Sequence, residues 1–90
     1  MAKLRIPTPL RPYAEGQSEV TVQGRNVGEA LNDLVAQYPS LKKHLFNESD
    51  ELRPFVNLFL GSEDVRHLQG TETPLGEDDK LMIIPSIAGG

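Results

Sequence analysis

The chain has 90 residues, the usual length of one compact domain and too short for two independent hydrophobic cores. Its hydrophobic fraction of 38% and charged fraction of 24% are typical of a globular protein and exclude a disordered or membrane-spanning class. The net charge of -4 opposes binding to nucleic acid and favours a partner protein with a basic surface.

Cysteine usage and apolar runs limit the chemistry and the location of the chain. There are no cysteines, so the chain forms no disulfide or thiolate metal site and has no thiol nucleophile of its own. The longest apolar run, residues 81–84, is too short to cross a bilayer, and Pro7 would interrupt an N-terminal export signal. We therefore expect a cytoplasmic protein with no membrane contact.

The first two predicted elements are strands that form a hairpin. Leu4 and Ile6 occupy alternate positions within residues 3–6, and residues 18–23 repeat this pattern, which is typical of half-buried strands. The connection over residues 8–17 is long for a hairpin, and its prolines oppose regular pairing. We expect this loop to form an irregular lip over one edge of the sheet.

A helix is predicted between Asn26 and Pro39. Asn26 followed by Glu29 is typical of a helix N-terminus, and a proline ends the pattern. The apolar residues between these signals fall on one helical stripe: Val27, Ala30, Leu31, Leu34, Val35 and Tyr38. A short helical turn is predicted at residues 40–45, followed by a solvated loop at residues 47–51.

The rest of the chain predicts three more strands. Residues 55–60 give the clearest strand pattern, and a turn leads from it to a short strand or extended segment at residues 65–68. A polar turn at residues 76–79 precedes the last strand, residues 81–85. The order of elements predicts an α+β fold in which one main helix packs on one face of a single sheet.

Strand parity separates the side chains that face the helix from those that do not. Asn57 marks the solvent side of its strand, because a buried amide without a partner is costly, and Phe59 shares that side. The last strand carries apolar pairs on both faces, so its sequence leaves open which pair faces the helix. We hypothesise that Phe59, Met82 and Ile84 form an exposed patch that binds a partner. The alternative is that the proline-rich loop covers them.

The segment after the last predicted strand is short, small and rich in glycine. A tail that ends in Ala88, Gly89 and Gly90 has little side-chain bulk and access to unusual dihedral angles, so its terminal carboxylate could thread into a narrow active site. The alternative is a frayed terminus without function. We predict a domain over residues 1–85 and a flexible tail over residues 86–90.

No group of residues has the pattern of a catalytic or metal site. His44 and His67 are isolated from paired carboxylates and hydroxyls and are predicted to be surface histidines. The acidic residues at 63–64 and 77–79 occupy predicted turns without a spaced ligand set. We therefore predict no catalytic residue, no metal site and no bound cofactor.

Three segments are informative when taken together: Phe55-Val56-Asn57, Gly76-Glu77-Asp78-Asp79 and the end of the chain from Ile84 to Gly90. In these segments the chain resembles the MoaD/ThiS family of ubiquitin-like sulfur carriers, over essentially its full length. The resemblance implies a ubiquitin-like β-grasp fold with a mixed sheet. Within the family, residues 6–12 and 63–66 are most similar to the CysO-type branch.

The resemblance implies that the chain is a protein co-substrate and not an enzyme. An E1-like adenylyltransferase would use ATP and magnesium to join the Gly90 carboxylate to AMP. Sulfur would then replace AMP and leave a C-terminal thiocarboxylate. In the CysO-type branch this group attacks an activated serine derivative on the way to cysteine, which implies a cysteine synthase as acceptor and a metalloprotease that removes the added residue.

The family's apolar contact near the end of the last strand corresponds to Ile84. With it, Phe59, Met82 and Ile87 are our candidate partner-binding residues, and Gly90, Gly89 and Ala88 form the functional tail.

Other functions stay open at this point. The small subunit of molybdopterin synthase and a thiamine-pathway carrier would have the same tail, although the proline-rich loop and residues 43–53 depart from the former. A modifier that conjugates to lysines is also compatible. A β-grasp interaction module with incidental glycines belongs to a different class, and deletion of Gly90 would harm it little.

Overall fold

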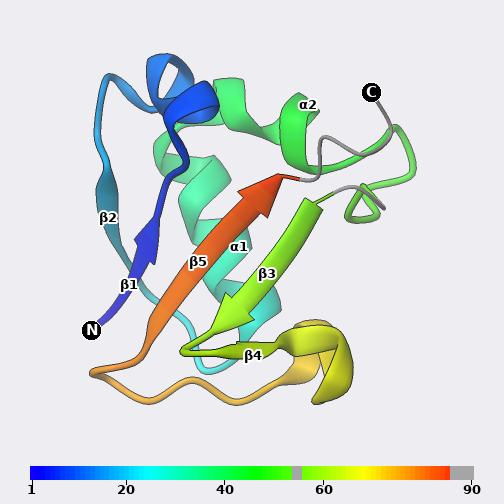
Figure 1. Cartoon of the computed structure of the whole chain (residues 1–90). Coiled ribbons are helices and arrows are strands. Elements are labelled where there is room, and N and C mark those ends of the chain that lie inside the picture. Colours follow the sequence, from blue (N-terminus) through cyan, green and yellow to red (C-terminus); the bar gives the residue numbers. More distant parts are fainter. Residues whose placement is uncertain (54–55, 86–90) are drawn as a thin grey trace.

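The computed structural model describes residues 1–53 and 56–85. Its sheet has five strands in the order β2-β1-β5-β3-β4, with β5 in the centre (Figure 1). β5 runs parallel to β1 and antiparallel to β3, so the predicted mixed sheet is confirmed. The strands are β1 (Ala2–Arg5), β2 (Glu19–Val22), β3 (Val56–Leu60), β4 (Glu63–Asp64) and β5 (Lys80–Pro85).

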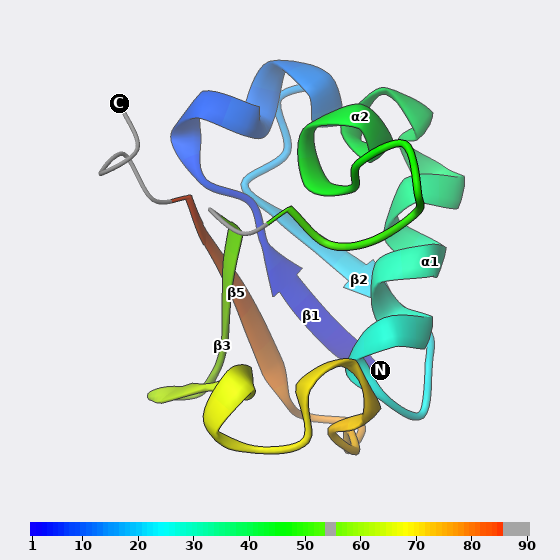
Figure 2. The same ribbon diagram turned by 90° about the vertical axis from the view of Figure 1, so that its right-hand side faces the viewer.

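One helix, α1 (Val27–Gln37), crosses one face of this sheet (Figure 2). The Asn26 side chain accepts a hydrogen bond of 2.8 Å from the Glu29 N–H, and the Glu29 carboxylate accepts one of 2.8 Å from the Arg25 N–H. These two bonds satisfy backbone donors at the start of the helix, as the sequence predicts. None of the described helices is long and apolar enough to cross a membrane.

The hydrophobic core lies between α1 and the sheet. The helix contributes Val27, Ala30, Leu31 and Leu34, all fully buried. Alternate residues of the strands meet them from the other side: Leu4, Val20, Val22, Val56, Leu58, Leu81 and Ile83. The predicted fold, with one main helix on one face, is therefore confirmed.

The proline-rich connection after β1 differs from the prediction. It forms a 3-10 helix, η1 (Thr8–Ala14), instead of an irregular lip. Proline suits this conformation because its fixed φ lies within the 3-10 range. Ala14 is fully buried, and η1 packs against a second 3-10 helix, η2 (Pro39–Leu41), at one end of the sheet (Figure 2). The loop therefore does not cover the sheet face opposite α1.

The short helical turn predicted after α1 is present as η2 and α2 (Lys42–Leu45), which bury Leu41 and Leu45. His44, predicted to be at the surface, is half-buried instead. Its ring stacks on Tyr13 of η1 with centroids 4.0 Å apart, and its buried Nε2 has no hydrogen-bond partner among the described residues. Packing between two distant segments causes this burial. The second histidine, His67, is exposed as predicted.

The segment after β3 also differs in part. Residues 65–68 do not form the predicted extended segment; Val65–His67 form a 3-10 helix, and the short strand β4 comes just before it. The Asp64 carboxylate causes the change of conformation, because it accepts a hydrogen bond of 2.9 Å from the Arg66 N–H and caps this helix. The predicted polar turn before β5 is confirmed: the Asp79 carboxylate accepts a hydrogen bond of 2.7 Å from the Gly76 N–H.

Candidate functional site

The two faces of β5 have different environments. Leu81 and Ile83 are 1% and 2% exposed and face α1, whereas Met82 and Ile84 are each 39% exposed on the opposite side. We call this opposite side the open face of the sheet. Strand register places Met82 beside Phe59 and Ile84 beside Asn57. The choice between the two pairs, which the sequence leaves open, is settled in favour of an exposed Met82 and Ile84.

Phe59, Met82 and Ile84 therefore lie on one face, and we call them the apolar patch. Phe59 is half-buried and not fully exposed as predicted. Its cross-strand neighbours are Met82 on β5 and Asp64 on β4, whose side chains lie within reach on the same face. The predicted grouping of the three residues is confirmed, and Met82 and Ile84 present most of its accessible surface.

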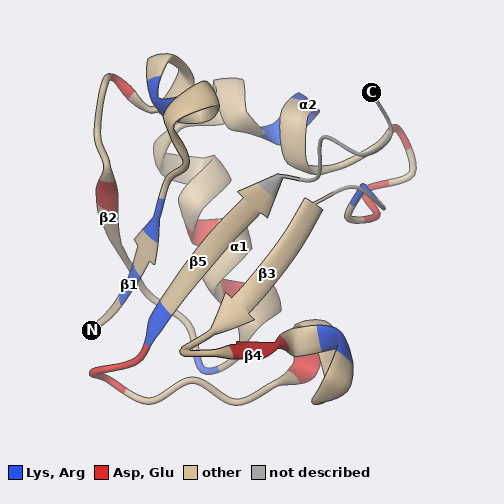
Figure 3. Cartoon of the chain, viewed as in Figure 1, with Lys and Arg blue, Asp and Glu red and all other residues tan. Residues whose placement is uncertain are grey.

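Basic side chains flank this patch, and sequence analysis did not single them out. Lys3, Arg5 and Lys80 are exposed on the open face. Register places Arg5 beside Met82 and Lys3 beside Lys80 (Figure 3). The available signal was the alternation of Lys3 and Arg5 with the buried Leu4. Their position beside β5 depends on a parallel pairing that local sequence does not reveal.

The root of the tail is held firmly by β5. This strand pairs with β3 along its length, from Leu60 opposite Leu81 to Val56 opposite Pro85. Ile87, Ala88, Gly89 and Gly90 lie outside the described residues, so their predicted roles and the domain boundary stay predictions. Five extended residues span about 18 Å at most. An enzyme that acts on Gly90 must therefore approach within that distance of the end of β5.

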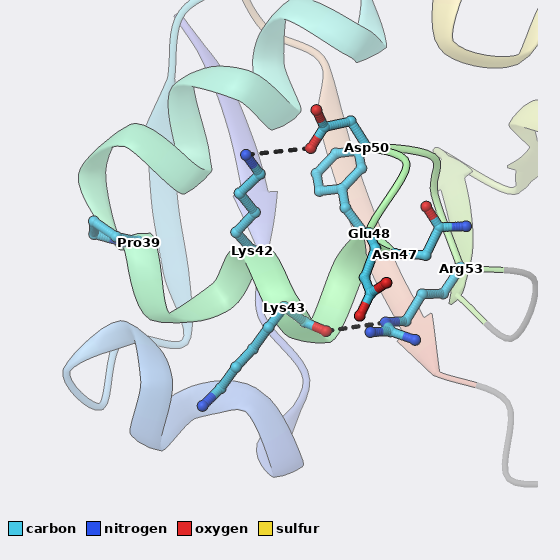
Figure 4. A pocket seen from close by; sticks show the side chains of 8 residues that line it. Pro39, Lys42, Lys43, Asn47, Glu48, Asp50 and Arg53 are labelled. Carbon is cyan, nitrogen blue, oxygen red and sulfur yellow. Dashed lines mark hydrogen bonds and ion pairs between the residues drawn. The ribbon is translucent and has the colours of Figure 1, made fainter.

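One surface hollow lies apart from the apolar patch. It lies between α2 and residues 47–53, and no patch residue lines it (Figure 4). Lys42 bridges it by an ion pair of 3.2 Å with Asp50, and the Arg53 Nε donates a hydrogen bond of 2.9 Å to the Lys43 carbonyl. These contacts join its two walls. Within residues 1–53 and 56–85, no three histidine or acidic side chains converge as a metal site.

Comparison with known proteins identifies the family of this fold. The family model described as "ThiS family" matches residues 4–90. The chain belongs to the ThiS family. It is 38% identical over 87 residues to the sulfur carrier protein CysO of Mycobacterium tuberculosis, and the match covers 94% of each chain. The predicted membership among MoaD/ThiS ubiquitin-like sulfur carriers, with a likeness to CysO, is confirmed.

Solved structures agree with this assignment. The crystal structure of the Amycolatopsis orientalis BexX/CysO complex matches with a TM-score of 0.89 and 33% identity, over 100% of both chains. The solution structure of small archaeal modifier protein 1 from Methanosarcina acetivorans also has a TM-score of 0.89 and 33% identity, over 99% of this chain and 95% of that one. The predicted ubiquitin-like β-grasp fold is therefore confirmed.

Because the two faces of β5 differ in burial, the same substitution at adjacent positions should have different effects on the free energy of unfolding. Ile83→Thr removes buried apolar volume and adds a hydroxyl to the core, so we expect a loss of about 2–4 kcal/mol in the free energy of unfolding. Ile84→Thr keeps a β-branched residue on the open face, and we expect less than about 1 kcal/mol. Denaturant unfolding of both variants measures the difference. Equal losses would contradict the assignment of faces.

Proposed function

We propose that this protein is a sulfur carrier whose Gly90 carboxylate is adenylated by an E1-like enzyme and then converted to a thiocarboxylate. The observation that carries the proposal is the family match, which extends through Gly89 and Gly90. The chain lacks cysteine, so the carried sulfur must come from another molecule. It must also be attached to the chain at a group other than a cysteine side chain.

The chemistry explains why a partner enzyme is needed. A carboxylate resists nucleophiles because its negative charge repels them and an oxide ion is a poor leaving group. A carboxylate oxygen of Gly90 attacks the α-phosphorus of ATP, and pyrophosphate leaves. A sulfide donor then attacks the acyl carbon, and AMP leaves with the carboxylate oxygen. The partner supplies ATP, magnesium and the catalytic groups, and the chain supplies the carboxylate.

The fold supports this role by its geometry. The strand that leads to the tail is the central one, so the root of the tail is fixed relative to the open face. Met82 and Ile84 of the apolar patch lie on the same strand, within the reach of the tail. An enzyme that covers Met82 and Ile84 would bury apolar surface and at the same time receive the terminal carboxylate. Ile87 lies between the patch and the glycines in sequence and completes the proposed contact.

For the acceptor, the likeness to proteins named CysO favours sulfur delivery towards cysteine. A cysteine synthase would then be the acceptor enzyme, and a metalloprotease would release the product. A molybdopterin synthase small subunit or a thiamine-pathway carrier would share the same activation step. The likeness to a small archaeal modifier protein supports a second candidate, in which the activated Gly90 is conjugated to lysines of other proteins.

Deletion of Gly90 tests the proposal. With the E1-like enzyme of the same cells, ATP and magnesium, we expect an AMP adduct on the intact chain by mass spectrometry. In the variant without Gly90, the rate of adduct formation should fall at least about 100-fold. The shortened tail no longer holds its carboxylate close to the α-phosphorus of ATP, and most of the rate gain from proximity is lost. A protein with one alanine appended after Gly90 is the matched control for tail length and should also fail.

Thermal unfolding should be unchanged in both tail variants, since neither alters the described core. An AMP adduct of equal yield on the chain without Gly90 would contradict the proposal. The β-grasp interaction module would then be the better description.

A further inference from the structure

The hollow beside α2 differs in charge from the chain as a whole. Lys42, Lys43 and Arg53 line it together with Glu48 and Asp50, so basic side chains outnumber acidic ones there, although the net charge of the chain is -4. Lys42 and Asp50 form an ion pair of 3.2 Å. The remaining charges are those of Lys43, Arg53 and Glu48, which leave one positive charge in excess (Figure 4).

The outer wall of this hollow is a well-structured loop. The Asn47 side-chain oxygen accepts hydrogen bonds of 2.8 and 3.1 Å from the Ser49 and Glu51 N–H groups, and the Asn47 N–H donates one of 2.8 Å to the Glu51 carbonyl. A β-bridge between Phe46 and Leu52 closes the base of the loop. The wall is therefore formed before any ligand binds, which lowers the entropy that binding must offset.

Arg53 is held in place by its backbone and by its side chain. The Arg53 N–H donates a hydrogen bond of 2.8 Å to the Leu45 carbonyl, and Nε donates one of 2.9 Å to the Lys43 carbonyl. The side chain is half-buried. The planar fork of a guanidinium matches the two oxygens of a carboxylate. Because Pro39 and Phe46 also line the hollow, it offers an apolar wall beside a carboxylate-binding group.

The end of β5 lies close to Arg53. Pro85 pairs with Val56 across the strands, and the Val56 N–H donates a hydrogen bond of 3.0 Å to the Arg53 carbonyl. The sequence continues for residues 86–90 beyond β5. Five extended residues span about 18 Å at most, so the tail is long enough to reach this hollow from its root.

The composition of the tail is complementary to this hollow. Residues 86–90 have one large apolar side chain, Ile87, no charged side chain, and the carboxylate of Gly90. Three extended residues separate Ile87 from that carboxylate by about 10 Å at most. A short connection also gives the tail an effective concentration of about 1 mM at the hollow. A contact too weak to bind a separate peptide would therefore still be populated.

We propose that the hollow beside α2 is a docking site for the chain's own tail. The Gly90 carboxylate binds at Arg53 and Lys43, and Ile87 packs on the apolar wall. This contact goes beyond the proposed function, because the chain makes it alone, before any enzyme binds. Docking is reversible, and a docked carboxylate is withheld from other proteins until a partner that binds the tail more tightly displaces it.

A spin label on the loop tests this docking. The chain has no cysteine, so Ser49→Cys provides a single labelling site. Ser49 is exposed, and its hydrogen bond to Asn47 is made by the backbone N–H. The measurement is the paramagnetic relaxation enhancement of the Gly89 and Gly90 amides in the free protein at low salt. In a semisynthetic chain that ends in a carboxamide we expect the enhancement to fall about threefold, because the terminal charge is lost.

Two substitutions in the labelled chain change the charge of the hollow in opposite directions. Lys43→Gln removes a cation but keeps the backbone carbonyl that Arg53 contacts, and it should lower the enhancement about twofold. Glu48→Gln removes a competing carboxylate and should raise it. Lys3→Gln makes the same charge change as Lys43→Gln at an exposed position on β1, away from α2 (Figure 1), and should leave it unchanged. Added salt should weaken the enhancement in the unsubstituted chain.

Several results would overturn the proposal. Equal enhancement in the carboxylate and carboxamide chains would show that the terminal charge is not bound. An equal loss in Lys3→Gln and Lys43→Gln would show an effect of net charge alone. These outcomes do not depend on adenylation: a tail that does not dock can still be adenylated, and a tail that docks can fail to be adenylated. The docking site and the sulfur-carrier function can therefore be rejected separately.

Discussion

β5 is hydrogen-bonded to a strand on each side, parallel to β1 and antiparallel to β3. In this central position, β5 has two structural roles. Leu81 and Ile83 complete the core under α1, and the same strand leads to the tail. The pairing with β1 covers residues 80–82, and the pairing with β3 continues to Pro85. The root of the tail is therefore anchored to the sheet through β3.

The open face follows from the small size of the domain. One helix covers one side of the sheet, and within residues 1–53 and 56–85 no second layer covers the other. Met82 and Ile84 remain accessible there beside basic side chains, while the neighbouring Ile83 is buried. Apolar residues in this position contribute little to folding, and we propose that they contact a partner.

Much of this arrangement could be predicted from the sequence. Asn26, Glu29 and Pro39 mark the ends of α1 by local hydrogen-bond chemistry and sterics, and strand parity groups Phe59 with Met82 and Ile84. Parity alone therefore groups the residues of the apolar patch. Which side of β5 meets the helix could not be predicted, because both sides are apolar and tertiary packing decides between them.

Other features depend on contacts between distant segments. The prolines of η1 are compatible with an irregular loop or a 3-10 helix, and burial of Ala14 against the rest of the fold decides the outcome. His44 is half-buried because Tyr13 stacks on it, which no local pattern indicates. The position of Lys3 and Arg5 beside β5 depends on the register between β1 and β5, at opposite ends of the chain.

The central claim is that the terminal carboxylate carries sulfur. Its most direct test is the intact mass of the protein purified from its own cells, alongside a form that lacks Gly89 and Gly90. The account predicts a native species heavier by the difference between a sulfur and an oxygen atom, absent from the truncated form. An unmodified mass for both forms, with no AMP adduct after incubation with the activating enzyme and ATP, would contradict it.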